Sequence, residues 1–462
     1  MRLLRGGGYS AAIWQAAWGT GRKRPVRATK LPRGFGVAGA VLTTLCLAWM
    51  PAAASNRLPS SPAVASAAPG QQLWASTLPG VCCGVGAVSP DGSAVFISGY
   101  QKTHFETVAY DAATGGQLWA ESYQAALYSN PTAIAVSADG ARVYVNGRTD
   151  TAQASGDATV AYDARTGTQL WARRYIPKGG GAYPTQIAVS PDDTTLYVAG
   201  AAWGPARHEA FAVLSYDAAT GKQRWAHWYT KATYTESVAV SPDSTTVYAT
   251  GADGSYFEGS ASALTIAYRA DGTLKWAVRY QNPYAGIAYG SRIVAGPSGG
   301  AVYVVGGDSN KYGHIDLATF AYRAATGQRI WLRHANLHIA GADPQVTVTP
   351  GGQTLFATAP RNGGRGPYAI AAYNASTGRT RWSRLAPDPD MFATGLIINP
   401  HGDTIFIGGD RTAAYSIANG TLLWITSRAL RSGLIGISPD GTRVFGTRSD
   451  ITTGITTIAY RT

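Results

Sequence analysis

Two short phrases recur in fixed order along residues 71–462, and this repeat constrains the fold more than any other feature of the sequence. The first phrase alternates apolar and polar residues, passes through a turn rich in Pro, Asp and Gly, and alternates again, as in IAVSPDDTTLYVAG (187–200). This pattern predicts a β-hairpin, because such turn residues reverse the chain between two strands. Other copies lie at residues 85–98, 134–147, 238–251, 292–307, 345–359, 396–409 and 435–447.

The second phrase follows the first and ends near a tryptophan, as in TVAYDAATGGQLWA (107–120). It predicts another hairpin, whose turn is closed by Gly in most copies. Further copies lie at residues 159–172, 212–226, 265–277, 319–332, 370–383 and 413–425. We interpret the Asp after the tyrosine in three copies (Asp111, Asp163 and Asp217) as a turn residue. We interpret the recurring tryptophans as packing residues between neighbouring repeats, since large aromatic side chains dominate core burial; they are Trp74, Trp119, Trp171, Trp225, Trp276, Trp331, Trp382 and Trp424.

One repeat therefore holds four antiparallel strands in about 40 to 50 residues, a length typical of a propeller blade. Eight repeats predict an all-β fold, an eight-bladed β-propeller of four-stranded antiparallel blades. The eighth copy ends at residues 457–462 without a tryptophan strand, and residues 71–75 (QQLWA) match the missing strand. We therefore expect the N-terminal strand to complete the last blade, which also removes exposed sheet edges.

The phrase Ala-Tyr-Asp-Ala-x-Thr-Gly-x-x-Leu-Trp resembles the tryptophan-docking repeat of propellers of the pyrroloquinoline quinone (PQQ) type. This superfamily contains the quinoprotein alcohol dehydrogenases and non-catalytic relatives that serve as scaffold and assembly proteins. The resemblance covers almost all of residues 71–462. It implies the propeller fold and does not by itself imply catalysis, because one fold hosts many functions.

Residues 1–54 differ from the repeats. Basic residues between Arg22 and Arg33 precede an apolar run at residues 35–49 and the sequence Pro-Ala-Ala-Ala at residues 51–54. This order is typical of a secretory signal peptide, with an uncleaved membrane anchor as the alternative. Residues 55–70 are rich in Ser, Ala and Pro and predict a flexible linker before the propeller of residues 71–462. The sequence thus predicts an extracytoplasmic protein that is secreted or held at the cell surface.

The formal net charge of +13 gives little reason to expect a nucleic-acid ligand. Residues 1–54 hold eight basic residues and no acidic ones, so 31 basic and 26 acidic residues lie beyond them. A mild excess spread along the chain is not a nucleic-acid footprint. We expect a monomer that has no nucleic-acid partner and touches a membrane only through an uncleaved N-terminal segment.

The turns inside both phrases are short, so we expect one uniform end of the ring and an opposite end that carries the longer connections. Recognition is expected at this variable-loop end, because variable loops on a rigid scaffold carry function and Trp, Tyr and Arg are frequent binding anchors. Trp203 and Trp228 have no place in the repeat and are expected to form a stacking platform on the third blade; the alternative is that each indole covers its own loop. The predicted ligand-binding residues are Trp203, Arg207, His208, Trp228, Tyr256, Tyr312 and His314.

Cys82 and Cys83 are adjacent and stand just before the first inner strand. Isolated thiols outside the cytoplasm tend to oxidise, but neighbouring cysteines bridge only through a strained ring, so two free thiols are the alternative. Quinoprotein alcohol dehydrogenases have a disulfide between adjacent cysteines beside the cofactor. The resemblance therefore implies a Cys82–Cys83 disulfide at the central channel.

Neither a catalytic residue nor a metal site is predicted. Residues 308–313 begin like a calcium loop but lack the acidic twelfth residue. His334 and His338 lie four residues apart in a segment that we expect to be a loop, where this spacing does not align two imidazoles. No motif matches the calcium ligands and catalytic Asp of the quinoprotein enzymes.

We therefore expect a non-catalytic scaffold without a cofactor that binds an extracytoplasmic protein, a small molecule or a glycan. One alternative is a PQQ-dependent dehydrogenase with calcium. Another is a carbohydrate-directed lyase or lectin-like propeller.

Overall fold

The computed structural model describes residues 67–124, 127–205, 209–229, 234–254, 259–339, 343–361, 367–387, 393–409, 411–427, 432–450 and 452–462. Strands and turns account for these residues, and no helix long and apolar enough to cross a membrane occurs among them. The predicted signal peptide or anchor at residues 1–54 and most of the linker lie outside the described residues.

The strands of the described residues form eight four-stranded antiparallel sheets, which we number as blades 1 to 8. Blades 1 to 4 consist of β2 (Cys82–Val88), β3 (Ala94–Gln101), β4 (His104–Asp111) and β5 (Gln117–Tyr123); β6 (Tyr128–Val136), β7 (Arg142–Asp150), β8 (Ser155–Asp163) and β9 (Gln169–Tyr175); β10 (Gly181–Val189), β11 (Thr195–Trp203), β12 (Glu209–Asp217) and β13 (Gln223–Tyr229); and β14 (Tyr234–Val240), β15 (Thr246–Asp253), β16 (Ser262–Arg269) and β17 (Leu274–Tyr280).

Blades 5 to 8 consist of β18 (Ala288–Ala295), β19 (Ala301–Ser309), β20 (Ile315–Arg323) and β21 (Arg329–Ala335); β22 (Gln345–Val348), β23 (Thr354–Pro360), β24 (Tyr368–Asn374) and β25 (Thr380–Leu385); β26 (Gly395–Ile398), β27 (Thr404–Gly408), β28 (Ala413–Ser416) and β29 (Leu422–Ile425); and β30 (Ser432–Ile437), β31 (Arg443–Asp450), β32 (Gly454–Arg461) and β1 (Gln72–Leu78).

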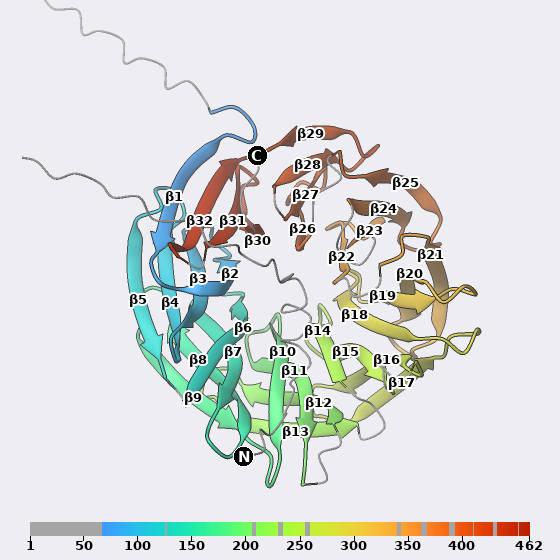
Figure 1. The fold of residues 1–462 in the computed structure, drawn as a ribbon, viewed down its shortest axis with the longest axis horizontal. Helices are drawn as coiled ribbons and strands as arrows, with labels where there is room; N and C mark the ends of the chain where they lie inside the picture. Colours follow the sequence, from blue (N-terminus) through green and yellow to red (C-terminus); the bar gives the residue numbers. More distant parts are fainter. Residues whose placement is uncertain are drawn as a thin grey trace, which may run out of the picture. The chain divides into compact units, whose positions relative to one another are not determined.

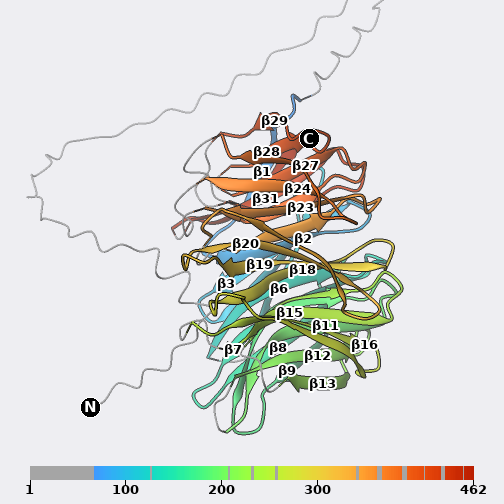
Figure 2. The same ribbon diagram turned by 90° about the vertical axis from the view of Figure 1, so that its right-hand side faces the viewer.

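The blades follow one another around a ring, with the first strand of each blade innermost (Figure 1). Each innermost strand contacts the innermost strand of the next blade, and β2 contacts both β6 and β30, so the ring closes. Seen from the side, the sheets succeed one another from β13 at one edge to β29 at the other (Figure 2). The predicted eight-bladed all-β propeller is confirmed.

The short turns of the two repeated phrases are held in most copies by side chains of the turn itself. In the first hairpin of blade 1, the Ser89 hydroxyl donates to the Asp91 carboxylate at 2.6 Å and accepts from the Ala94 amide at 2.9 Å. In the second hairpin, the carboxylate of Asp111 accepts from the amide and the hydroxyl of Thr114, each at 2.8 Å. These local bonds satisfy turn groups within the turn itself, which is why Ser, Thr and Asp favour such positions.

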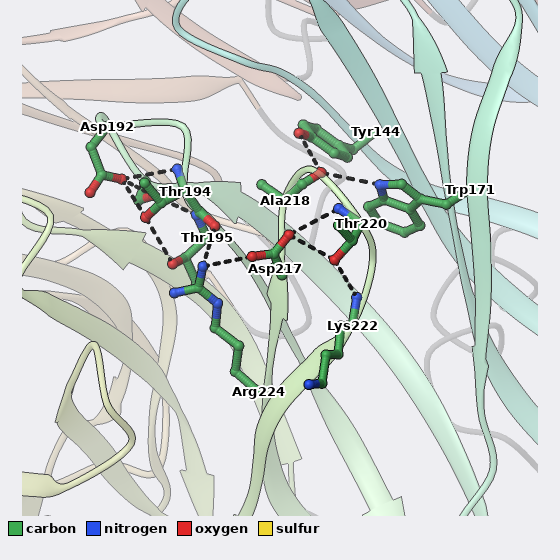
Figure 3. Close-up of polar contacts among 11 residues, drawn as sticks. Tyr144, Trp171, Asp192, Thr194, Thr195, Asp217, Ala218, Thr220, Lys222 and Arg224 are labelled. Carbon is green, nitrogen blue, oxygen red and sulfur yellow. Dashed lines mark hydrogen bonds and ion pairs between the residues drawn. The ribbon is translucent and has the colours of Figure 1, made fainter.

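The repeated tryptophan joins each outer strand to the next blade. On blade 2, the indole of Trp171 donates to the Ala218 carbonyl of blade 3 at 3.1 Å, and the hydroxyl of Tyr144 donates to the same carbonyl at 3.0 Å (Figure 3). The ring lies directly over Gly221, where an added Cβ would be 2.6 Å from the indole. Equivalent indole bonds run from Trp74 to Ala112, Trp119 to Ala164, Trp225 to Ala270, Trp276 to Ala324, Trp331 to Ala375 and Trp382 to Ile417.

Blade 8 is completed by both ends of the propeller sequence. Strand β1 pairs with β32, with Gln72 opposite Tyr460, as predicted. Across this junction the Gly70 amide donates to the Arg461 carbonyl at 2.8 Å and the Arg461 amide donates to the Gln71 carbonyl at 2.9 Å. The continuous turn of blade 1 has the same two bonds, between Asp111 and residues 115 and 116. Gly70 also lies against the ring of Trp424, as Gly221 lies against Trp171. We call this turn of the second phrase, which packs against the tryptophan of the preceding blade, the docking turn. The two chain segments therefore form a complete docking turn.

Candidate functional site

A cavity of about 670 Å³ opens beside blade 5 at the variable-loop end. Its walls come from the connection between β17 and β18, the connection between β19 and β20, and the segment that leaves β21. Antiparallel strands place these connections at the same end, because every second connection returns to it. The cavity is therefore a product of three segments that are far apart in the sequence.

Asparagine side chains give two of these connections their shape. The side-chain carbonyl of Asn282 accepts from the Tyr284 amide at 2.7 Å and the Gly286 amide at 3.2 Å. The side-chain carbonyl of Asn310 likewise accepts from the amides of Tyr312 and His314, at 2.9 and 3.2 Å. Such Asx turns are a local property of the sequence, so the shape of these two connections is set by their own residues.

Asp308 lies at the base of the cavity and is 3% exposed. It is the penultimate residue of β19, where it pairs with Ala288 and Asp316. One carboxylate oxygen accepts from the Tyr280 hydroxyl and faces His334 Nε2, each at 2.7 Å, and the other accepts from the amide of Asn282. Burial, followed by the bond to Asp308, raises the pKa of Tyr280, so this hydroxyl stays a donor. The carboxylate is thus satisfied from within the protein.

His334 and His338 are positioned by different partners. The sequence assigns His334 to a loop, but β21 extends to Ala335, and its pairing with β20 carries the imidazole toward Asp308. His338 lies beyond the strand with a φ of 50°, and its imidazole meets that of His314 edge to face at 4.6 Å. The backbone amide of His338 donates to Asp316 at 3.2 Å.

The second aspartate of the cavity, Asp316, is 6% exposed. Its remaining oxygen accepts from the side-chain amide of Asn310 at 2.8 Å. The rim of the cavity is aromatic, since Tyr284 is 59% exposed and Tyr312 is 74% exposed. The ammonium group of Lys311 lies 4.9 Å from the centre of the Tyr312 ring. The base of the cavity therefore holds the two buried aspartates, and the rim holds the exposed tyrosine rings and the lysine.

Among the predicted ligand-binding residues, Tyr312 and His314 lie in this cavity. Arg207, His208 and Tyr256 lie outside the described residues. The sequence did not predict that Asp308, Tyr284, His334 and His338 lie in the same cavity as these two residues. The two Asx turns were the available signal, because they mark connections that return to the same end of neighbouring strands.

The structure places Trp203 and Trp228 on blade 3 but does not bring their rings together. Trp203 pairs with Gly181, and the residue before it, Ala202, pairs with Ala182. Trp228 pairs with Ala212, whose side chain lies on the same face of the sheet as that of Ala202. Alternate residues of a strand point to opposite faces, so the two indoles lie on opposite faces of the blade.

Both indoles have partners within the protein. Trp203 packs against Tyr183 at 4.7 Å between ring centres, and the indole of Trp228 donates to the Tyr175 hydroxyl at 2.8 Å. Each ring is half-buried. Their binding role stays a prediction, with two separate rings in place of one platform.

Cys82 and Cys83 lie at the start of β2, the innermost strand of blade 1. Both are free thiols in this structure, with Cys82 half-buried and Cys83 exposed. Burial, with a contribution from the neighbouring Cys83, raises the pKa of the Cys82 thiol to about 12. Their place on the innermost strand agrees with the expected strand order, and both the channel position and the disulfide stay predictions.

The described residues contain no group of three or more His, Cys, Asp or Glu side chains arranged to hold a metal ion. Asp308 begins the calcium-like segment, and its carboxylate already accepts a hydrogen bond from Tyr280 and faces His334.

The family model PQQ_2, described as outer membrane protein assembly factor BamB, matches residues 63–251, 155–333 and 261–447. The matches overlap and start in different blades, because a repeated sequence aligns in several registers. The chain belongs to this family of PQQ-like β-propellers.

Two solved structures are similar to this chain over most of their length. BamB from Moraxella catarrhalis is 14% identical and superposes with a TM-score of 0.54, over 84% of this chain and 99% of that chain. Hydrazine synthase from Kuenenia stuttgartiensis is 16% identical with a TM-score of 0.49, over 84% and 97% of the two chains. No curated protein sequence matches this chain. At 14% identity the likeness to BamB shows the fold alone and leaves the site of this PQQ-like propeller to be argued from its own residues.

Proposed function

We propose that this PQQ-like propeller is a non-catalytic scaffold that acts outside the cytoplasm and binds a segment of a partner protein at its variable-loop end. The cavity of blade 5 carries the proposal, because it is the place where exposed aromatic side chains surround a preordered polar base. The family description as an assembly factor supports a protein partner. The basic and apolar order of residues 22–54 supports export.

The chemistry of the cavity favours binding over catalysis. His334 and Asp308 form a pair, but the hydroxyl next to them, that of the half-buried Tyr280, is used as a donor to Asp308. A nucleophilic hydroxyl is activated by a lowered pKa or by a base that is free to take its proton, whereas burial and the bond to the Asp308 carboxylate raise the pKa of Tyr280. Tyr284 and Tyr312 instead present rings and hydroxyls to solvent, which suits an interface anchor.

Affinity capture with the full-length chain tests this proposal. Wild-type protein and the double variant Tyr284→Ala/Tyr312→Ala are exposed to a cell-envelope fraction, and bound proteins are quantified by mass spectrometry. We expect the double variant to lose at least about tenfold of its specific partner, since aromatic anchors typically contribute 2 kcal/mol or more.

Leu118→Ala is the control, because Leu118 is 51% exposed on the outermost strand of blade 1, away from blade 5. Equal capture by the wild type and the double variant would place binding elsewhere on the ring. Capture of a glycan in place of a protein would favour the lectin-like alternative, which the same tyrosine rings would serve by stacking on sugars.

A further inference from the structure

The groups that a ligand meets in the blade 5 cavity differ from the groups that build it. Both aspartates are almost completely buried, and each of their carboxylate oxygens faces a donor of the protein. Little of either residue is therefore exposed to a ligand. Their role in the cavity is to hold His334 and the Asn310 turn in place.

The exposed polar groups of the cavity include imidazoles and an ammonium group. His334 turns Nε2 toward Asp308, so its Nδ1 atom is directed away from the acid, and its side chain is 48% exposed. The imidazoles of His314 and His338 meet at their edges, and His314 is exposed. The Lys311 ammonium stands at the rim beside Tyr312.

We propose that the cavity recognises carboxylate groups, and that the partner segment of the proposed function is an acidic peptide. This inference rests on the proposed function and names the chemistry of its ligand. A carboxylate reaching the rim meets the Lys311 ammonium and the imidazole of His314, which form charge-assisted hydrogen bonds with it. The rings of Tyr284 and Tyr312 cover the apolar part of the same segment.

A basic segment fits the cavity less well. The carboxylates that could attract a cation, those of Asp308 and Asp316, are buried and already accept hydrogen bonds from the protein. The face of the Tyr312 ring is already approached by Lys311, the protein's own cation. A lysine or arginine of the ligand would thus face like charge at the rim, which disfavours binding.

Fluorescence anisotropy with the full-length chain and three labelled peptides tests the inference. The peptides alternate Tyr with Glu, Gln or Lys and are otherwise identical. We expect the Glu peptide to bind at least about tenfold more tightly than the Gln peptide, and the Lys peptide to bind more weakly than either. The preference for Glu should decrease as salt is added, because exposed charges are screened.

Variants assign the binding to the cavity. Lys311→Gln and His314→Gln should each weaken binding of the Glu peptide about five- to tenfold, in line with the loss of one charge-assisted bond. Both residues are exposed, so the melting temperature should be unchanged. Lys222→Gln is the matched control, since Lys222 is an exposed lysine in a turn at the uniform end (Figure 3) and should leave binding unaltered.

The inference is overturned if the Lys peptide binds more tightly than the Glu peptide, if no peptide binds, or if Lys311→Gln and His314→Gln bind the Glu peptide like the wild type. These outcomes are distinct from failure of the proposed function. If only the proposed function is wrong, the Glu peptide still binds in the cavity, but the Tyr284→Ala/Tyr312→Ala variant captures the same proteins as the wild type.

Discussion

Asp157 of β8 shows how a single buried group sets the pH dependence of stability. It is 2% exposed, and the side-chain amide of Asn146 donates to it at 2.6 Å. Burial raises its pKa to about 7, whereas an unfolded aspartate titrates near pH ~3.9. The folded state therefore favours the protonated form, and this contribution to stability is complete below about pH 4 and is lost as the pH rises through about 7.

We predict that Asp157→Asn stabilises the propeller at about pH 8 and has little effect at about pH 4. The amide keeps an acceptor for Asn146 and carries no charge, and each unit of pKa shift corresponds to ~1.4 kcal/mol. Thermal melting of wild type and variant across this pH range measures the difference. A variant less stable than the wild type at about pH 8 would contradict the assignment.

Asp163, at the other end of the same strand, is the control of opposite sign. Hydrogen bonds from the amide and hydroxyl of Thr166 lower its pKa. Its contribution to stability is present above about pH 4 and is lost as the pH falls through the lowered value. Asp163→Asn should therefore cost stability at about pH 8 and little in strong acid.

Glycine positions in two turns separate backbone strain from tryptophan packing. Gly378 has a φ of 68°, and an added Cβ would lie 2.6 Å from the indole of Trp331. Gly299 has a φ of 72°, but an added Cβ would have no neighbour within 4 Å. Both substitutions by alanine cost about 1 kcal/mol of backbone strain.

We predict that Gly378→Ala lowers the free energy of unfolding by about 1 to 3 kcal/mol more than Gly299→Ala, because overpacking adds to the strain. Chemical denaturation of the two variants measures this difference. Equal losses would show that the indole moves aside at little cost, and that the docking turn is less tightly packed than the structure indicates.

At the scale of the element, β1 is the strand whose removal opens the ring. It supplies Trp74, which is buried against Phe445 of blade 8 and donates to Ala112 of blade 1. We predict that a chain lacking residues 1–78 melts several degrees lower than the full chain and begins to unfold early. Loss of a buried tryptophan alone typically costs 3 to 5 kcal/mol.

A chain lacking residues 1–66 is the matched control for this deletion. It keeps Gly70 and Gln71, which make the junction with Arg461. We expect it to melt like the full chain. Identical melting of the two shortened chains would mean that β1 does not close the ring.

The hairpins and the closing strand could be predicted from the sequence because their causes are local and repeated. The serine, aspartate and glycine of a typical turn form bonds within a few residues, as Ser89 does with Asp91. The tryptophan phrase at residues 71–75 identifies the closing strand by its likeness to the other copies. Repetition supplies the evidence that a single hairpin lacks.

The cavity of blade 5 could not be predicted in the same way, because it depends on pairing register and on connections that do not repeat. The sequence pattern places Asp308 at the start of a calcium-like segment, whereas its pairing with Ala288 and Asp316 makes it a buried strand residue. Register also separates Trp203 from Trp228, although both come from one blade. The face of the sheet on which a side chain lies is set by strand pairing, and a short sequence motif does not predict it.

At the scale of the whole molecule, the ring separates stability from recognition. The uniform end holds the docking turns that join the blades, and substitutions there act on folding. The variable-loop end carries the cavity, whose rim residues Tyr284 and Tyr312 are exposed. This division lets the surface around blade 5 vary while the scaffold stays closed.

Site-specific photo-cross-linking in intact cells tests the central claim most directly. A benzophenone amino acid replaces Tyr284 or Tyr312 at the cavity rim, or Leu118 or Leu170 on the outer strands of blades 1 and 2, where both leucines are exposed. Our account predicts a cross-linked partner protein from positions 284 and 312 and none from positions 118 and 170. Adducts from the outer-strand positions alone would contradict it and would move the binding surface to the wall of the ring.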